Sequence, residues 1–500
     1  MKFLTWQNPE QLIVAQVLIK ILNNSVAEFR LDMIKFKSYF FALVMGLCIA
    51  SCGGDGDDND GGGNDNTGGN TETPVKPDKM SLTVTLNEPG TLVEKIDATK
   101  KYTTASLKVV GKINGTDILF LRDMAGGDVK GKPTNGNLAY LDLSDAQIVH
   151  GGKAYLNYQK IDLYLTEDNT IPAGMFYGCV SLIKVYLPNS VTKMEGNIFY
   201  GCNAIENIYL PSSLKKIEGD PFYTYTRNPL KADIANLKAW NDIDMSKRNS
   251  NISEYVTFTY KGKEITELTV PSGIKELSSN YMLISQLTMV NVPGTVKKIG
   301  NHALSSTKLK KITLSNGIEE FGDYAFADCK KITSLQIPTT VKNIGQNCFR
   351  GCTGLTEIKL PNSVETLGAY AFSDCTSLTV IDLSSTKITQ LYTSTFSKCS
   401  SLKDLKLPNG LMNISESAFW SATGLKTLTI PASVTYIGDH AFLSCDNMLE
   451  LHMKSKTAPK YGGNSSSLGF GARKIDIYVP KGCKEAYNKQ PWKSHNIIEE

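Results

Sequence analysis

Residues 352–375 read CTGLTEIKLPNSVETLGAYAFSDC and contain one full unit of a 23-residue repeat. Ile358 and Leu360 lie two positions apart, so their side chains point to the same face of a short strand. Pro361 ends this strand, because proline has no N–H for ladder pairing. The Gly-x-x-Ala-Phe segment that follows has apolar spacings of four and five residues. This spacing predicts a helical turn packed on the opposite wall of the unit.

The unit recurs along most of the chain, and eleven strand segments are recognisable between residues 171 and 455. The slot of the repeated cysteine is filled by Cys179, Cys202, Cys329, Cys352, Cys375, Cys399, Ala422 and Cys445. No copy can bury its own apolar face, so the copies must stack and pair their strands at about 4.8 Å. The sequence therefore predicts an α/β repeat fold, a solenoid with a parallel β-sheet on one face.

The repeat register also explains most of the eleven cysteines. Alanine fills the cysteine slot at Ala422, and Cys348 stands where another copy has Ala371. The slot thus requires a small buried group rather than a bonding partner. Side chains stacked in parallel are also poorly aimed for the torsion of a disulfide. We therefore predict that the cysteines of the repeats are buried free thiols.

An export signal precedes the repeats. Lys35 and Lys37 come before the apolar run 39–50, which is followed by the small residue Ser51 and by Cys52. This order is typical of a signal peptide, and a run of 12 apolar residues is too short to span a bilayer. The cysteine after the small residues resembles a bacterial lipobox, which implies that Cys52 carries lipid. The alternative is a soluble signal peptide that ends near a cysteine.

Two further segments flank the signal. We interpret residues 1–32 as an extension from a start codon set too early, since a secretion signal normally begins a chain. The alternative is a short helix, because apolar residues recur there at helical spacing. Residues 53–79 are acidic, rich in Gly, Asp and Asn, and nearly free of apolar side chains, so they predict a disordered tether. This stretch resembles the surface-export signal of certain Gram-negative lipoproteins, which implies a protein that faces the cell exterior.

The repeat elements Leu-x-x-Ile-x-Leu-Pro, Ile-Gly-x-x-Ala-Phe and Cys-x-x-Leu resemble the BspA-type leucine-rich repeats of bacterial surface proteins. The resemblance covers about residues 171–455. Residues 80–170 are similar to the N-terminal capping region of such proteins, and residues 475–492 resemble their closing strand and helix. Caps are physically required, because terminal repeats would otherwise expose apolar core and an open strand edge.

The chain thus divides into eight predicted segments. They are an upstream extension (1–32), a lipoprotein signal peptide (33–52), a tether (53–79), an N-terminal capping domain (80–170), repeats (171–222), an irregular insertion (223–257), further repeats (258–455) and a C-terminal cap (456–500).

The segment 223–257 breaks the regular rhythm and carries Tyr223, Tyr225 and Trp240 beside several basic residues. Insertions in repeat arrays lie on one surface and often bind partners. The alternative is a degenerate repeat whose aromatic side chains cover a break in the core. The sequence leaves both interpretations open.

Composition and motifs argue against several function classes. The 53 basic and 49 acidic residues leave a net charge of only +4, without a long basic stripe for nucleic acid. We find no paired histidines, no row of carboxylates and no nucleophile elbow, so we expect no metal, no cofactor and no enzymatic activity. The stretch 126–132 lacks only the last residue of a phosphate-binding loop, but Pro133 there supplies no hydroxyl, which indicates a surface turn.

The exposed face of the strands is where a solenoid is expected to bind. Tyr186 and Tyr209 occupy equivalent outward positions on neighbouring strands, with Lys184 and Asn207 two residues earlier. Aromatic residues are frequent in binding hot spots, and they can also stack on sugar rings. The alternative is a cross-strand pair that only stabilises the ladder.

Two functions remain after these exclusions. The family resemblance implies an adhesin-like outer-membrane lipoprotein that binds a host or matrix protein and contacts the membrane only through its lipid. The other is a lipoprotein that captures glycans for nutrient uptake. Because the predicted strand face offers two tyrosines among many polar residues, we favour a protein ligand.

Overall fold

The computed structural model describes residues 81–157, 165–224, 229–247, 256–463, 468–470 and 473–500. These residues all belong to the compact unit Pro77–Glu500. The predicted signal peptide, Cys52 and the tether lie outside the described residues, as does Tyr225.

The N-terminal part begins a parallel sheet and covers its end. Asn114 caps the longest helix there, and its side chain forms a capping box with Asp117. Asp117 also accepts hydrogen bonds from the backbone N–H groups of Gly90 and Leu92, which fixes the segment before the helix. The elements are β1 (Ser81–Leu86), α3 (Leu92–Lys95), α4 (Ala98–Lys101), β2 (Ser106–Ile113), α5 (Gly115–Met124), β3 (Tyr140–Asp142) and β4 (Ala146–Ile148).

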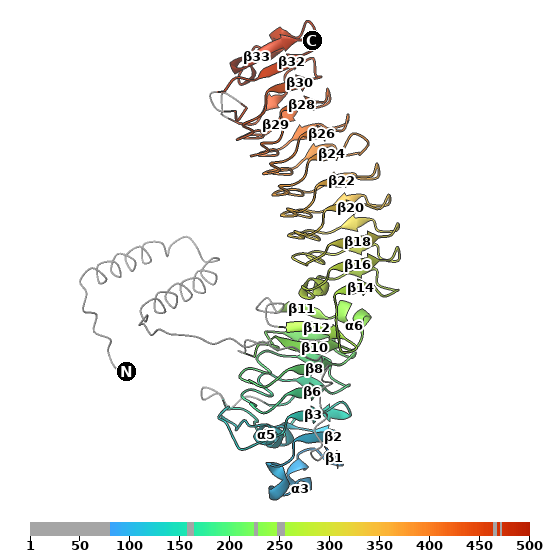
Figure 1. Ribbon diagram of the computed structural model, residues 1–500, viewed down its shortest axis with the longest axis vertical. Coiled ribbons are helices and arrows are strands. Elements are labelled where there is room, and N and C mark those ends of the chain that lie inside the picture. Colours follow the sequence, from blue (N-terminus) through green and yellow to red (C-terminus); the bar gives the residue numbers. More distant parts are fainter. Residues whose placement is uncertain (1–80, 158–164, 225–228, 248–255, 464–467, 471–472) are drawn as a thin grey trace, which may run out of the picture. The chain divides into compact units, whose positions relative to one another are not determined.

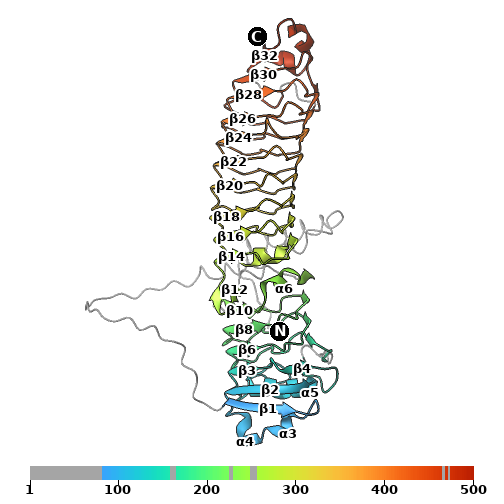
Figure 2. The same ribbon diagram turned by 90° about the vertical axis from the view of Figure 1, so that its right-hand side faces the viewer.

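Parallel strands then stack one on the next along one face of the solenoid, which we call the strand face (Figures 1 and 2). Their residues alternate between buried and outward positions, as the sequence predicts for Ile358 and Leu360. The strands are β6 (Lys184–Tyr186), β8 (Asn207–Leu210), β10 (Leu230–Ile234), β12 (Val256–Tyr260), β14 (Glu267–Thr269), β16 (Met289–Val292), β18 (Lys311–Leu314), β20 (Ser334–Gln336), β22 (Glu357–Lys359), β24 (Val380–Asp382), β26 (Asp404–Lys406), β28 (Thr427–Ile430), β30 (Glu450–Met453) and β32 (Asp476–Val479).

The opposite wall also carries short parallel strands, which we call the second sheet. The helical turn predicted there is wrong. In one copy, Tyr370 and Asp374 have φ values of 58° and 61°, and this left-handed backbone cannot continue a helix. The strands are β5 (Thr170–Ile171), β7 (Lys193–Met194), β9 (Lys216–Glu218), β11 (Asp244–Lys247), β15 (Glu276–Leu277), β17 (Lys298–Ile299), β19 (Glu320–Phe321), β21 (Asn343–Ile344), β23 (Thr366–Leu367), β25 (Gln390–Leu391), β27 (Asn413–Ile414), β29 (Tyr436–Ile437) and β31 (Lys460–Tyr461).

Phenylalanine and cysteine side chains form two rows in the core of the regular repeats. The ring of Phe372 stacks on those of Phe349 and Phe396, at centroid distances of 5.3 and 5.6 Å. The Cys375 thiol donates to the carbonyl oxygen of Phe349 in the preceding repeat, with 3.1 Å between Sγ and O. The same bond recurs at Cys202, Cys352, Cys399 and Cys445. The nine cysteines of the described residues carry no disulfide, and eight of them are buried.

The segment predicted to be an irregular insertion contributes strands to both sheets. Strand β10 pairs with β8 and β12, and β11 pairs with β9. Between them lies the helix α6 (Leu237–Asn241), which occurs in no regular repeat among the described residues. The segment has lost the repeat consensus, yet it keeps enough apolar positions in register, such as Ala232 and Ile234, to continue the core.

Pairing stops on both faces immediately after this segment. Within the described residues, no ladder joins β12 to β14 or β11 to β15. A hairpin with β13 (Lys263–Glu264) and the 3-10 helix η2 (Ser279–Leu283) lie at this break in pairing. We call the break, together with α6 before it, the junction. Asn280, which is 3% exposed, holds it together by donating to the carbonyl oxygens of Trp240 and Ile243, both at 2.8 Å.

The last strand β33 (Asn496–Glu499) pairs with β32 and ends the strand face. Two short 3-10 helices, η3 (Lys484–Tyr487) and η4 (Trp492–Ser494), precede it. Tyr487 and Trp492 are buried and pack edge to face, with ring centroids 5.5 Å apart. These aromatic rings close the apolar core at the C-terminal end.

Candidate functional site

Two tyrosines stack on the strand face near the N-terminal end. Strands β6 and β8 pair in parallel, and this register places Tyr186 opposite Tyr209. The two rings lie 4.0 Å apart between centroids and are inclined by 9°. Tyr186 is 36% exposed, which makes it one of the more exposed large apolar side chains described. The pair therefore presents ring edges and hydroxyl groups to solvent.

Charged side chains of both signs surround the tyrosine pair. The ladder places Asp142 beside Tyr186 on one side and Asp233 beside Tyr209 on the other. In the neighbouring column Lys184 pairs with Asn207, and its Nζ lies 5.8 Å from the ring centroid of Tyr209. We call the set Asp142, Lys184, Tyr186, Asn207, Tyr209 and Asp233 the tyrosine patch.

Neighbouring groups hold the two carboxylates of the patch in place. The Lys108 ammonium lies 3.5 Å from Asp142 and 2.6 Å from Asp145. Asp233 accepts hydrogen bonds from the Thr259 hydroxyl at 2.7 Å and from the Gly262 N–H at 2.8 Å. Both carboxylates are thus ordered from outside the patch and need no partner within it.

The two phenols also influence each other electrostatically. Burial raises the pKa of Tyr186 above its ordinary value, and the hydrogen bond between its hydroxyl and that of Tyr209 raises it further. Tyr186 therefore stays neutral at physiological pH. Its hydroxyl can donate and accept hydrogen bonds but does not act as an anion.

The other predicted site residues lie elsewhere. Tyr223 belongs to a separate row on the turns that follow the core phenylalanines, where Tyr200 stacks on Tyr177 at 5.1 Å and Tyr223 lies 5.8 Å from Tyr200. Trp240 is only 1% exposed, and its Nε1–H donates to the Asn280 carbonyl oxygen at 3.3 Å. The structure thus brings four of the predicted ligand-binding residues together and separates Tyr223 and Trp240 from them.

Sequence reasoning missed Tyr177 and Tyr200. A signal was present, because the pair Phe-Tyr recurs at Phe176, Phe199 and Phe222 with the 23-residue period. A side chain that directly follows a core phenylalanine in successive repeats must form a column.

The described residues offer no group of three or more His, Cys, Asp or Glu side chains that could hold a metal ion. Among the helices described, none combines the length and the apolar character needed to cross a membrane.

Comparison with known proteins places this geometry in a family. The model of the BspA type leucine rich repeat region matches residues 154–255, 233–333 and 319–449, in six copies. No curated protein matches the chain.

Several solved structures are similar to the chain. A leucine-rich repeat protein from Bacteroides ovatus is 20% identical, with a TM-score of 0.47, and the match covers 68% of this chain and 89% of that one. For a leucine-rich repeat protein from Eubacterium ventriosum the values are 18%, 0.40, 69% and 84%. For the pneumococcal vaccine antigen PcpA they are 20%, 0.35, 64% and 89%. With the family model spanning more than half of its residues, the chain belongs to the BspA-type leucine-rich repeat family.

Proposed function

We propose that this chain is a non-enzymatic cell-surface lipoprotein whose solenoid binds a protein ligand through the tyrosine patch. The observation that carries the proposal is the partly exposed pair of Tyr186 and Tyr209, set among charges of both signs. Aromatic residues contribute most of the energy at many protein interfaces, and a rim of mixed charges supplies specificity. Membership in a family of bacterial surface proteins supports a role outside the cell.

The stacking of the rings favours a protein ligand over a glycan. A sugar ring packs against the free face of an aromatic ring. At a centroid distance of 4.0 Å, Tyr186 and Tyr209 cover one face of each other, and the Lys184 ammonium lies over the ring of Tyr209. What remains accessible is a row of edges and hydroxyls, which fits the backbone and side chains of a polypeptide.

Anchoring completes the proposal. Lipid on Cys52 and a flexible acidic segment over residues 53–79 would hold the solenoid on the outer membrane, facing the exterior. The order of charged, apolar and small residues before Cys52 supports this. Metabolic labelling with a palmitate analogue tests it. We expect the wild-type chain to be labelled and Cys52→Ala to remain unlabelled, whereas equal labelling of the two would contradict the anchor.

Binding of the double variant Tyr186→Ala/Tyr209→Ala tests the patch directly. We expect the purified wild-type protein to bind one or more extracellular-matrix proteins on an array and the double variant to lose this binding. Tyr370→Ala/Tyr392→Ala is the matched control, because it removes two exposed tyrosines from the opposite wall, 36% and 41% exposed. Unchanged binding by the patch variant, or binding to glycans alone, would refute the proposal.

A further inference from the structure

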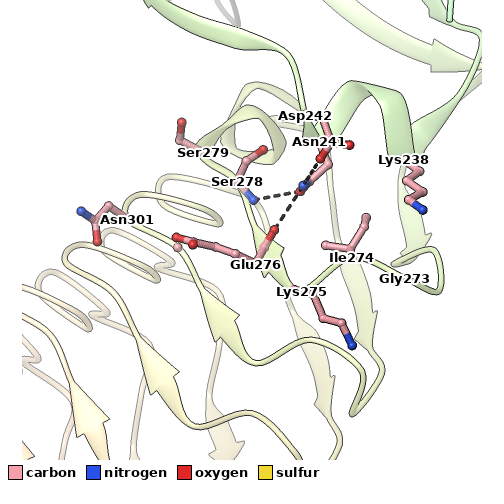
Figure 3. Close-up of a pocket in the computed structure, with 11 residues that line it drawn as sticks. Lys238, Asn241, Asp242, Gly273, Ile274, Lys275, Glu276, Ser278, Ser279 and Asn301 are labelled. Carbon is pink, nitrogen blue, oxygen red and sulfur yellow. Dashed lines mark hydrogen bonds between the residues drawn. The ribbon is translucent and has the colours of Figure 1, made fainter. Parts of the chain in front are cut away.

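At the junction, a side chain makes the hydrogen bonds that a neighbouring strand makes in a paired sheet. Where the second sheet stops between β11 and β15, the carboxamide of Asn241 occupies the edge of β15 (Figure 3). Its Nδ2 donates to the Glu276 carbonyl oxygen at 3.1 Å, and its Oδ1 accepts from the Ser278 N–H at 2.9 Å. In a parallel ladder, one residue of the neighbouring strand makes this same pair of bonds through its own N–H and C=O. The Asn241 side chain thus takes the place of a strand residue, and an open space lies beside it.

This open space forms a pocket of about 600 Å³. Its volume lies within the range of about 300–1,000 Å³ that is usual for small-molecule sites. Residues from both sides of the break line it, with Lys238, Asn241 and Asp242 on one side and residues 273–276, 278–279 and 300–301 on the other. Such pockets form preferentially where two structural units meet. A ligand here would contact both sections of the solenoid.

One end of the pocket is basic. Lys238 and Lys275 both line this end, near Gly273. Figure 3 shows the two lysines on the same side of the pocket. Within the part of the chain that the structure describes, neither ammonium lies within ion-pair distance of a carboxylate. A Cβ on Gly273, whose φ is 85°, would lie 3.1 Å from the Nζ of Lys238, so glycine leaves room for this ammonium.

The other end of the pocket is polar. Ser278, Ser279 and Asn301 supply hydroxyl and amide groups, and Asp242 and Glu276 supply carboxylates. Figure 3 shows the Glu276 side chain extending toward Asn301 and away from the two lysines. Its carboxylate lies 3.6 Å from the Lys298 ammonium, so its charge is partly balanced from outside the pocket. Ile274 is the single apolar side chain in the lining.

We propose that this pocket binds an anionic saccharide. The acidic group of the saccharide would lie between Lys238 and Lys275, and its sugar hydroxyls would lie at the polar end. Amide groups and serine hydroxyls both donate to and accept from sugar hydroxyls, and carboxylates accept from them. A peptide fits less well, because peptide sites depend on apolar or aromatic anchors and the lining offers only Ile274. The charged lining residues are exposed, so added salt should weaken binding.

Isothermal titration of the full chain tests the proposal with five probes. Trigalacturonate offers carboxylates, a sulfated disaccharide offers sulfates, maltotriose is neutral, triglutamate is an acidic peptide, and inorganic sulfate reports an adventitious ion only. We expect one or both acidic sugars to bind, and maltotriose, triglutamate and inorganic sulfate to bind at least tenfold more weakly. The tighter of the two acidic sugars identifies the anionic group as carboxylate or sulfate.

The double variant Lys238→Glu/Lys275→Glu should raise the Kd of the preferred acidic sugar at least tenfold. The control Lys261→Glu/Lys263→Glu carries the same change of net charge on the β12–β13 hairpin and should bind like the wild type. Thermal melting verifies that both variants fold, and Asn301→Ala provides a second, uncharged test at the polar end, where we expect a two- to fivefold loss. No binding of either acidic sugar, equal binding of triglutamate, maltotriose or sulfate, or an unchanged Kd in the lysine variant would overturn the proposal.

Discussion

The regular repeats between β19 and β29 and the junction around α6 and η2 complete the core and the strand edges in different ways. In the regular repeats every copy buries a phenylalanine on its neighbour, with ring centroids 5.3 to 6.0 Å apart from Phe326 to Phe442. At the junction no ladder joins the strands of either face, and side chains such as Asn241 and Asn280 bond to backbone groups instead.

The difference shows what each kind of packing provides. Repeated units give a continuous apolar core, and where one of the two faces lacks a ladder, as between β23 and β25, the other face stays paired. The junction gives up pairing on both faces, and side chains complete the strand edges beside a concave, polar surface. In this solenoid the repeats supply the stability, and the pocket of the junction accompanies their interruption.

The largest expected effect is alkaline unfolding of the repeats. Burial raises the pKa of the thiols of Cys329 and Cys445 to about 11 and about 12, against about 8.5 in an unfolded chain. Their contribution to stability is therefore complete below about pH 8.5 and is lost as the pH rises through the folded values. Each buried thiol should lower the free energy of unfolding by about 1.4 kcal/mol per pH unit in this window.

Urea denaturation followed by circular dichroism at pH 7, 8.5 and 9.5 measures this loss. Cys445→Ala should show a shallower slope by the contribution of one thiol. The region between Cys202 and Cys329 contains no cysteine, so titration of buried thiols does not change the stability of the junction itself. A free energy of unfolding that stays constant from pH 8 to 9.5 would contradict the prediction.

Removal of one ring from the phenylalanine row should have the largest effect of any single substitution. Phe372 is fully buried between Phe349 and Phe396, so Phe372→Ala leaves a cavity that two neighbouring repeats cannot fill. We expect a loss of about 3–5 kcal/mol in the free energy of unfolding, measured by chemical denaturation. The nearby exposed Tyr370→Ala is the control and should change it by less than about 0.5 kcal/mol. Equal effects of the two would show that the row does not stabilise the fold.

At the junction, Asn280→Ala should cost about 2–3 kcal/mol, because the carbonyl groups of Trp240 and Ile243 lose their donor. Hydrogen exchange followed by mass spectrometry should show faster exchange in β11 and β15 than in the wild type, with β22 unchanged. Asn301→Ala, at an exposed position, is the matched control and should leave exchange in β11 and β15 as it is. Uniform acceleration across all strands would mean that the junction is no weaker than the repeats.

The smallest effect is expected for Cys375→Ala. Alanine already fills this slot at Ala422, which is as buried as Cys375. Loss of the sulfur atom and of its bond to the Phe349 carbonyl should cost only about 1 kcal/mol in chemical denaturation. Cys375→Leu should cost more, because the row has no room for a larger group. A loss above about 3 kcal/mol for alanine would show that the thiol itself is required.

The strands of the regular repeats were predictable because their period and apolar spacing are local properties of the chain. The backbone structure of the wall that follows each strand was not predictable. Apolar spacings of four and five residues suit a helical turn as well as short strands joined by left-handed residues. Residues such as Tyr370 and Asp374 are held in that conformation by the next turn of the solenoid, through bonds such as that from the Tyr370 N–H to the Thr393 carbonyl oxygen.

The candidate sites show the same division. The periodic register placed Tyr186 beside Tyr209 from sequence alone, since parallel pairing repeats every outward position on the next strand. Whether Trp240 faces solvent or core was undecidable, because no period applies where the consensus is lost. The structure decides it through the hydrogen bond between the Trp240 indole and Asn280, a residue 40 positions away.

The sequence by itself thus determined the repeat, its family resemblance and the columns of side chains on the strand face, all of which follow from a 23-residue period. Only the tertiary structure decided where the two sheets break, and that the Asn241 carboxamide completes the edge of β15 beside an open pocket. The physical reason is that a repeat is specified by neighbours along the chain, whereas an interruption is specified by the groups that meet across it.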